Sequence, residues 1–112
     1  MKRKKIYISG QISGLEPEDA EAAFNKAEKT LRAQGYSVEN PIRLGVEYVS
    51  GKGWDYYMRK GITLLMDCDA IYMLTGSSNS KGASIERQLA YDLGMPIYIE
   101  ADGDLQKEIL NG

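Results

Sequence analysis

The sequence predicts an α/β fold, a three-layer sandwich in which helices cover both faces of a parallel sheet of four to five strands. Two observations support this prediction. Short apolar runs rich in β-branched and aromatic residues alternate with longer segments of helical periodicity. Glycine, proline or asparagine separates many of these segments. Such alternation produces βαβ units with right-handed crossovers, so the carboxyl ends of the strands should meet at one edge of the sheet.

Four runs are predicted as strands because of their β-branched and aromatic content. They are residues 5–9 (KIYIS), 36–39, 69–74 (DAIYML) and 96–100 (PIYIE). Gly10 ends the first strand and Asn40-Pro41 closes the second. The third is a nearly continuous apolar run, which is typical of a central parallel strand. Cys68, just before it, is interpreted as a residue of the core edge.

Four segments have the apolar spacing of helices. They are residues 17–34, 54–66, about 81–93 and 104–110. Pro17 near the start of the first and Gly35 after its end are typical helix boundaries, and Gly94 stops the third. Gly61 interrupts the second at a cost of about 1 kcal/mol relative to alanine, which suggests that a neighbour requires a missing side chain. The glycine-containing segment 42–53 is interpreted as a loop, and loops of this length in compact domains are often functional lids.

The composition limits the classes of function. A chain of 112 residues with a formal net charge of −2 is expected to form one domain, residues 1–112, with no nucleic-acid or membrane partner. It has one cysteine and no histidine, which excludes a disulfide framework, a Cys/His zinc site and a Ser-His nucleophile pair. No apolar run approaches the roughly 20 residues of a membrane span. We therefore expect a cytoplasmic protein without a metal or cofactor.

The stretch from Ser77 to Ala90, SSNSKGASIERQLA, leads from the third strand into a helix. Its Ser80, Lys81 and Gly82 stand at a helix start, where N–H groups without intrahelical partners and a positive dipole can bind a phosphate. Glu86 follows and could act as a nucleophile or base. The structural alternative makes Ser80 only an N-cap and Glu86 only a solvated helix residue.

The loop after the first strand, bracketed by Gly10 and Gly14, is expected at the same edge of the sheet. It would therefore face the loop from Thr75 to Gly82. The pattern is not GxGxxG, so a dinucleotide fingerprint is not supported. The alternative is a plain strand-to-helix turn.

Six segments occur in order across nearly the whole chain: IYISGQISG, NP, WDYYM, LLMDCDAIYML, SKGASIE and LAYDLGMPI. Together they resemble the nucleoside 2-deoxyribosyltransferase superfamily. The resemblance is greatest to a branch of small bacterial and phage proteins, DUF4406, and the 2′-deoxynucleoside 5′-phosphate N-hydrolases are relatives. The expected fold is accordingly Rossmann-like, with a flavodoxin-like strand order.

This resemblance implies cleavage of the N-glycosidic bond of a (deoxy)nucleoside 5′-monophosphate, by hydrolysis or base transfer, through a covalent ribosyl-Glu86 intermediate. An ionised carboxylate suits such a reaction because the transition state carries positive charge on the sugar. Tyr7 would lie close to this nucleophile. The residues that would line the sugar and phosphate are Gly10, Ile12, Ser13, Gly14, Ser80, Lys81 and Gly82. The expected partners are a small-molecule nucleotide and a second copy of the chain, in a homodimer or larger homo-oligomer.

Two positions depart from the pattern of the relatives. Gly61 stands where the hydrolases carry an aspartate, whose role would be absent or supplied by Asp55, Asp67 or a partner subunit. Ser77 stands where many relatives have a tryptophan. These departures favour an alternative, a non-catalytic nucleotide-binding or sensing module. A third alternative is an oligomerising protein with a tyrosine-rich surface, formed by Tyr48, Tyr56, Tyr57 and Tyr91.

Overall fold

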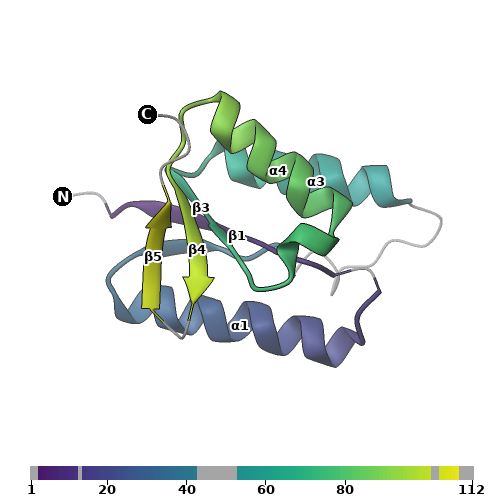
Figure 1. Ribbon diagram of the computed structural model, residues 1–112, viewed down its shortest axis with the longest axis horizontal. Helices are drawn as coiled ribbons and strands as arrows, with labels where there is room; N and C mark the ends of the chain where they lie inside the picture. Colours follow the sequence, from purple (N-terminus) through teal and green to yellow (C-terminus); the bar gives the residue numbers. More distant parts are fainter. Residues whose placement is uncertain (1–2, 13, 43–52, 102–103, 109–112) are drawn as a thin grey trace.

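The computed structural model describes residues 3–12, 14–42, 53–101 and 104–108 (Figure 1). Strands and helices alternate along most of these ranges. The elements are β1 (Lys5–Ser9), α1 (Pro17–Ala33), β2 (Ser37–Glu39), α3 (Trp54–Met66), β3 (Ala70–Met73), the 3₁₀-helix η1 (Ser77–Asn79), α4 (Lys81–Asp92), β4 (Ile97–Ala101) and β5 (Asp104–Glu108). Apart from its ends, Ile42 and Gly53, the predicted loop 42–53 lies outside the described residues.

The sheet has the order β2-β1-β3-β4-β5, and its first four strands are parallel. This confirms the predicted α/β fold and the flavodoxin-like order. β1 is central because it pairs with β2 on one side and β3 on the other. Ser9 at the end of β1 pairs with Met73 at the end of β3. The loops that follow these strands therefore start side by side, as predicted.

The prediction of a closing helix at 104–110 is wrong, because Asp104–Glu108 form β5, antiparallel to β4. Ala101 pairs with Asp104, so two residues connect the strands. In the sequence these are Asp-Gly, a pair that two-residue hairpins favour. Pairing with β5 also satisfies backbone groups that β4 would otherwise leave open at the edge of the sheet. This pairing outweighs the weak helical spacing of the segment.

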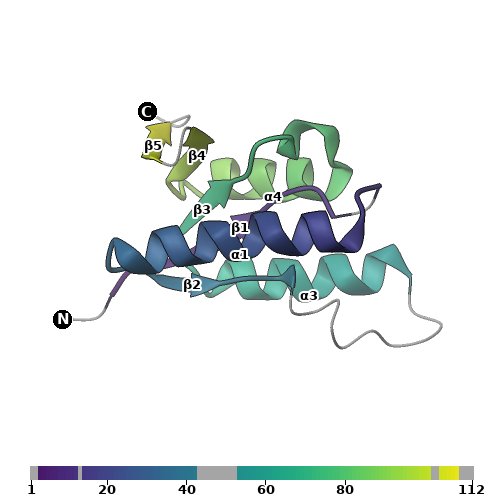
Figure 2. The same cartoon turned by 90° about the horizontal axis from the view of Figure 1, so that it is seen from below.

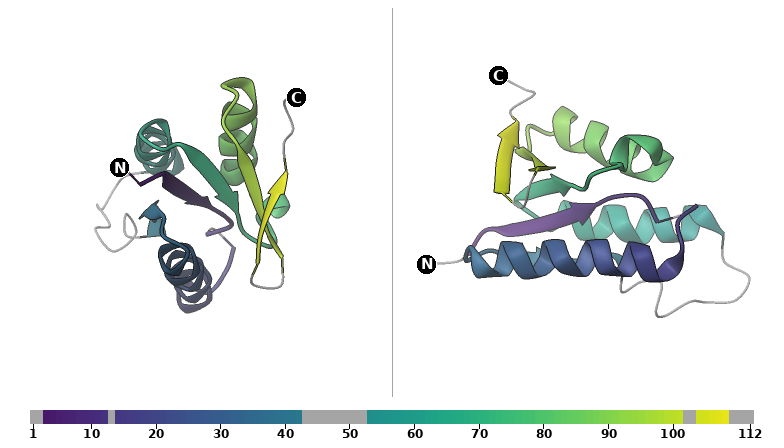
Figure 3. Two further views of the ribbon diagram at one scale, coloured as in Figure 1. Left: turned by 90° about the vertical axis from the view of Figure 1, so that its left-hand side faces the viewer. Right: turned by 60° about the horizontal axis from the view of Figure 1, so that its bottom comes forward.

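Helices cover both faces of the sheet (Figures 1 and 2), with α1 on one face and α3 and α4 on the other. In the left view of Figure 3, α3 and α4 lie on the side of the sheet opposite α1. Each face has its own apolar cluster. On the α1 face the buried cluster comprises Ile6, Ile8, Phe24, Ala27, Leu31, Val38, Ala70, Tyr72 and Leu74. On the other face it comprises Tyr7, Leu65, Cys68, Ile71, Met73, Ala83, Ala90 and Ile97. Among the described helices none is long and apolar enough to span a bilayer.

Two aspartates hold the amino-terminal edge of the sheet, where β1 begins. Asp69 Oδ2 accepts a hydrogen bond from the backbone N–H of Lys5 at 2.8 Å. Asp67 Oδ2 lies 2.7 Å from Lys5 Nζ. Both carboxylates are thus at the edge opposite the carboxyl ends of the strands. Within one chain, Asp67 therefore cannot take the role of the aspartate expected at the position of Gly61.

A buried polar cluster fastens the chain after β2 to α1. Asn40 is buried, and its Nδ2 donates to Glu28 Oε1 at 3.0 Å and to Asn25 Oδ1 at 3.1 Å. Its Oδ1 accepts from the backbone N–H of Ile42 at 3.0 Å. Glu28 Oε2 also binds Arg32 Nε at 2.7 Å. The Asn40-Pro41 segment that follows β2 is therefore anchored to α1 by side-chain hydrogen bonds.

Replacing Asn40 with alanine is expected to destabilise the protein by about 1–3 kcal/mol, because the buried Glu28 carboxylate loses a donor and the partly buried N–H of Ile42 loses its acceptor. Urea unfolding monitored by circular dichroism measures this change. Asn79→Ala is the matched control, since Asn79 is exposed and lies in η1 outside this cluster, and it should cost less than about 0.5 kcal/mol. Equal losses for the two variants would show that the cluster contributes nothing specific.

Candidate active site

Glu86 lies on the inward face of α4 and only 6% of it is exposed. Its Oε2 accepts a hydrogen bond from Tyr7 Oη at 2.6 Å, and its Oε1 accepts one from Ser9 Oγ at 2.7 Å. Tyr7 and Ser9 point to the same face because side chains alternate along β1. The alternative of a solvated Glu86 is thus wrong. A buried carboxylate is held at both oxygens by hydroxyl groups from the central strand.

Burial and hydrogen bonding act in opposite directions on this carboxylate. Burial raises the pKa of Glu86, and the hydroxyl groups of Tyr7 and Ser9 lower it, with a net shift upward. Burial and the neighbouring carboxylate both raise the pKa of Tyr7. Tyr7 therefore keeps its proton and serves as a hydrogen-bond donor to Glu86.

Gly61 of α3 closes the site from the other side. A Cβ at this position would lie 2.8 Å from Tyr7 Oη and 3.0 Å from Glu86 Oε2. Real Cβ atoms do not approach oxygen atoms so closely, so only glycine lets α3 pack here without a shift. The close approach of α3 explains why the sequence accepts the helix-weakening glycine.

The start of α4 combines a cap with two residues that contact α3. Ser80 Oγ accepts a hydrogen bond from the backbone N–H of Ala83 at 3.1 Å, so the predicted N-cap is present. Gly82 is buried, and a Cβ on it would lie 2.8 Å from Met58 Sδ. Lys81 Nζ lies 4.9 Å from the ring centroid of Trp54. The backbone N–H groups of Lys81 and Gly82 have no intrahelical acceptor at this position, as anion sites require.

The loop after β1 has structural reasons for its glycines. A Cβ on Gly10 would lie 2.8 Å from Leu74 Cδ1, so Gly10 permits close packing of the loop on the residue after β3. Gly14 has a φ of 87°, in the left-handed region that favours glycine. The side chain of Ile12 is 44% exposed at the rim. Ser13 lies outside the described residues.

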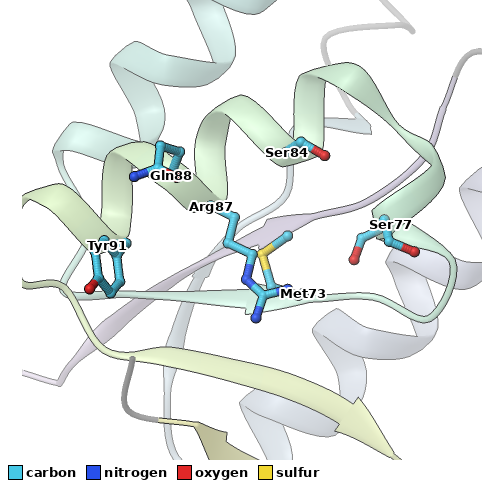
Figure 4. A pocket seen from close by; sticks show the side chains of 7 residues that line it. Met73, Ser77, Ser84, Arg87, Gln88 and Tyr91 are labelled. Atoms are coloured by element: carbon cyan, nitrogen blue, oxygen red, sulfur yellow. The ribbon is translucent and has the colours of Figure 1, made fainter. Parts of the chain in front are cut away.

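A separate groove of about 380 Å³ lies along another flank of α4 (Figure 4). It is lined by Met73, Ser77, Ser78, Ser84, Arg87, Gln88 and Tyr91. Figure 4 shows the Arg87 side chain extending toward Met73 on the floor of the groove. Glu86, Tyr7 and Gly61 do not line it. The groove is therefore distinct from the carboxylate site, although both lie beside the same helix.

Comparisons with known proteins place the chain in a family. A family model described as a domain of unknown function, DUF4406, matches residues 4–99. The chain belongs to the DUF4406 family. Among solved structures, this DUF4406 protein is similar to a 2-deoxyribosyltransferase from the psychrotolerant bacterium Bacillus psychrosaccharolyticus. The TM-score is 0.68, with 21% sequence identity over 85% of this chain and 70% of that chain.

At that identity the structural likeness shows a shared fold, which agrees with the fold expected from the sequence. No curated protein sequence matches this DUF4406 chain. The relation to the N-hydrolases and the roles of the site residues stay predictions.

Ser9 was not among the residues predicted for the site. The sequence feature that indicates Ser9 is its position two residues after Tyr7, since residues i and i+2 of a strand share one face. The residues between Lys5 and Ser9 are all apolar or aromatic. Ser9 is buried, and its hydroxyl oxygen lies 2.7 Å from Glu86 Oε1. A polar residue on the buried face of a strand indicates a buried partner, and here that partner comes from α4.

The raised pKa of Glu86 predicts how stability depends on pH. The folded chain binds the Glu86 proton more tightly than the unfolded chain, whose carboxyl has the ordinary pKa of 4.5. This contribution to stability is present below the unfolded pKa and is lost as pH rises through the folded pKa. The free energy of unfolding of wild type should therefore fall, relative to Glu86→Gln, as pH rises above the unfolded pKa of 4.5 and through the raised folded pKa. Urea unfolding of both proteins at each pH measures the difference, and a constant difference would contradict the assignment.

Proposed function

We propose that this protein cleaves the N-glycosidic bond of a (deoxy)nucleoside 5′-monophosphate, by hydrolysis or base transfer, through a covalent ribosyl-Glu86 intermediate. The observation that carries the proposal is the buried Glu86 carboxylate, which accepts hydrogen bonds from Tyr7 and Ser9 at 2.6 and 2.7 Å. The shared fold with a protein named as a 2-deoxyribosyltransferase supports it.

In the proposed first step, one Glu86 oxygen attacks C1′ of the sugar. The bond between C1′ and the base nitrogen breaks, and its electron pair leaves with the base, which takes a proton from solvent. The oxocarbenium-like transition state carries positive charge, which a nearby carboxylate stabilises. Water or a second base then attacks C1′ and releases the carboxylate, with loss of one proton to solvent.

Tyr7 and Ser9 act in this scheme as positioning residues. Their hydroxyl hydrogen bonds orient the carboxylate and favour its ionised form, against the burial that raises the pKa of Glu86. Because the pKa of Tyr7 is raised, its phenol stays a donor and does not serve as the base at neutral pH.

The start of α4 supports a phosphorylated substrate. Ser80, Lys81 and Gly82 place a hydroxyl, an ammonium group and two helix-start N–H groups at the carboxyl edge of the sheet. Glu86 lies one to two turns further along the same helix. One ligand with a sugar and a 5′-phosphate could therefore reach both.

Two observations favour a second candidate, a nucleotide-binding or sensing module without turnover. Glu86 is almost fully buried, and α3 lies against it through Gly61, with no aspartate at that position. The third alternative, a tyrosine-rich docking surface, has less support. Tyr56 and Tyr57 contact each other on α3, Tyr91 lines the groove beside α4, and Tyr48 lies outside the described residues.

The test is incubation of the protein with each common ribo- and deoxynucleoside 5′-monophosphate, with chromatography of the released base. Base release by wild type supports the enzyme. Binding in calorimetry without release supports the sensing module, and the absence of both contradicts each candidate.

The expected homodimer or larger homo-oligomer remains part of the proposal. A single chain already buries the Glu86 carboxylate, so a partner would serve to cover the bound substrate.

A further inference from the structure

Trp54 and Lys81 form a pair at the rim of the candidate site. Trp54 is the first residue of α3, and Lys81 is the first residue of α4. Both helices lead toward the amino-terminal edge of the sheet, so both begin at its carboxyl edge, where ligands of such folds bind. The Lys81 ammonium lies 4.9 Å from the centroid of the Trp54 ring. The indole is nevertheless 45% exposed.

The seam between α3 and α4 connects this pair to the carboxylate. Trp54, Met58 and Gly61 lie on one face of α3 because they are four and three residues apart. Met58 packs on Gly82, and Gly61 packs on Glu86 and Tyr7. Gly61 is seven positions after Trp54, which corresponds to about 10 Å along the helix. This separation is comparable with the size of a mononucleotide.

The stereochemistry of a nucleotide matches this layout. Displacement at C1′ requires the nucleophile opposite the leaving base, and in a β-nucleotide the base and the 5′-phosphate project from the same face of the sugar. A sugar whose C1′ faces Glu86 therefore directs its base and phosphate away from the carboxylate, which lies inside the seam. Trp54 and Lys81 lie at the outer end of the seam.

We propose that Trp54 is the residue that stacks on the nucleobase, and that nucleotide binding moves Lys81 from the indole face to the 5′-phosphate. This inference rests on the proposed function. An aromatic face binds any base by stacking, and an ammonium group is attracted more strongly to a phosphate dianion than to a ring. Trp54 thereby supplies an aromatic face to the site. Ser77, which stands where many relatives have a tryptophan, supplies none and lines the groove on the other flank of α4.

Calorimetry in a Glu86→Gln background, which prevents turnover, tests the inference with two kinds of probe. The first is the set of common nucleoside 5′-monophosphates, and the second is ribose 5-phosphate and deoxyribose 5-phosphate, which lack a base. Trp54→Leu is expected to weaken nucleotide binding about 5- to 150-fold. It should leave the sugar phosphates within about 2-fold, whereas Lys81→Met should weaken both probes. Trp54→Phe should retain most of the nucleotide affinity, since it keeps an aromatic face.

Trp54 is the single tryptophan of the chain, so its fluorescence reports on this position alone. Nucleotides are expected to quench it. Tyr91→Leu is the matched control, because Tyr91 is similarly exposed at 40% but lines the other groove. Equal effects of Trp54→Leu on nucleotide and sugar phosphate, or a larger effect of Tyr91→Leu, would overturn the inference and leave the proposed function standing. No nucleotide binding together with no base release by wild type would overturn both.

Discussion

Glu86→Gln is expected to reduce base release from a nucleoside 5′-monophosphate by at least about 1000-fold, because an amide oxygen is a far weaker nucleophile than a carboxylate. The side chain keeps its size, so the packing around Gly61 is preserved. The melting temperature should not fall, since the change removes a buried charge whose pKa is raised by desolvation. Chromatography of the released base measures the loss. Intact-protein mass spectrometry should detect a ribosyl phosphate adduct on wild type and not on the variant.

Glu28→Gln is the matched control for this experiment. Glu28 is also a buried glutamate, but it lies on α1, on the opposite face of the sheet, where it binds Arg32 and Asn40. Its replacement should lower stability and leave the rate of base release per folded molecule unchanged. Wild-type activity of Glu86→Gln would refute the covalent mechanism.

Intermediate losses are expected for Tyr7→Phe and Ser9→Ala, about 10- to 100-fold each, because each removes one hydrogen bond to the carboxylate.

Gly61→Ala is expected to destabilise the protein by about 1–3 kcal/mol, although the same change in an ordinary helix interior stabilises by about 1 kcal/mol. The reason is the added Cβ, which would lie 2.8 Å from Tyr7 Oη and 3.0 Å from Glu86 Oε2. Base release should also fall, by about 100-fold, because the added Cβ displaces the Glu86 carboxylate and the Tyr7 hydroxyl from their present positions. Urea unfolding and the base-release assay measure the two effects.

A double-mutant cycle separates this contact from a general effect on the helix. Tyr7→Phe removes the oxygen that lies nearest to the added Cβ, and the next tyrosine atom, Cζ, is 4.0 Å away. Gly61→Ala should therefore cost less stability in the Tyr7→Phe background than in wild type. Equal costs in both backgrounds would show that the destabilisation by Gly61→Ala does not arise from its contact with the Tyr7 hydroxyl. The geometry also indicates that an aspartate cannot simply be restored at position 61, because any side chain there would require α3, Tyr7 or Glu86 to shift.

Local sequence signals predicted most elements well. The strand at Lys5–Ser9 and the helix at Trp54–Met66 have the predicted bounds. Gly35 and Gly94 each follow a helix. Their own φ values are 95° and 74°, which glycine adopts without strain. The prediction of a closing helix is wrong because the segment pairs with β4, and a local pattern does not report that pairing. Helical spacing over a few residues is a weak signal when a neighbouring strand has an open edge.

The candidate site was only partly predictable from the sequence. Glu86 is predicted from its place after the helix start and from the family resemblance, and Tyr7 from the resemblance alone; the two lie within hydrogen-bond distance in the structure. Ser9 was missed. The glycine at position 61 indicates a neighbour that requires a missing side chain, but the identity of that neighbour, the Tyr7–Glu86 pair, could not be predicted. Both depend on how closely α3 and α4 approach β1, and no local pattern reports such a distance. The sequence places Trp54 only at the start of a predicted helix, because its neighbour Lys81 belongs to another helix.

The sequence by itself determined the order and type of most elements, the parallel sheet and the family, because periodicity and turn residues act over short distances along the chain. Only the tertiary structure decided that Glu86 is buried and that Tyr7 and Ser9 hold its two oxygens. Tyr7 and Glu86 are 79 positions apart in the sequence, and their contact exists only where β1, α3 and α4 pack together. The chemistry of the carboxylate follows from that packing, because burial and hydrogen bonding set its pKa in opposite directions.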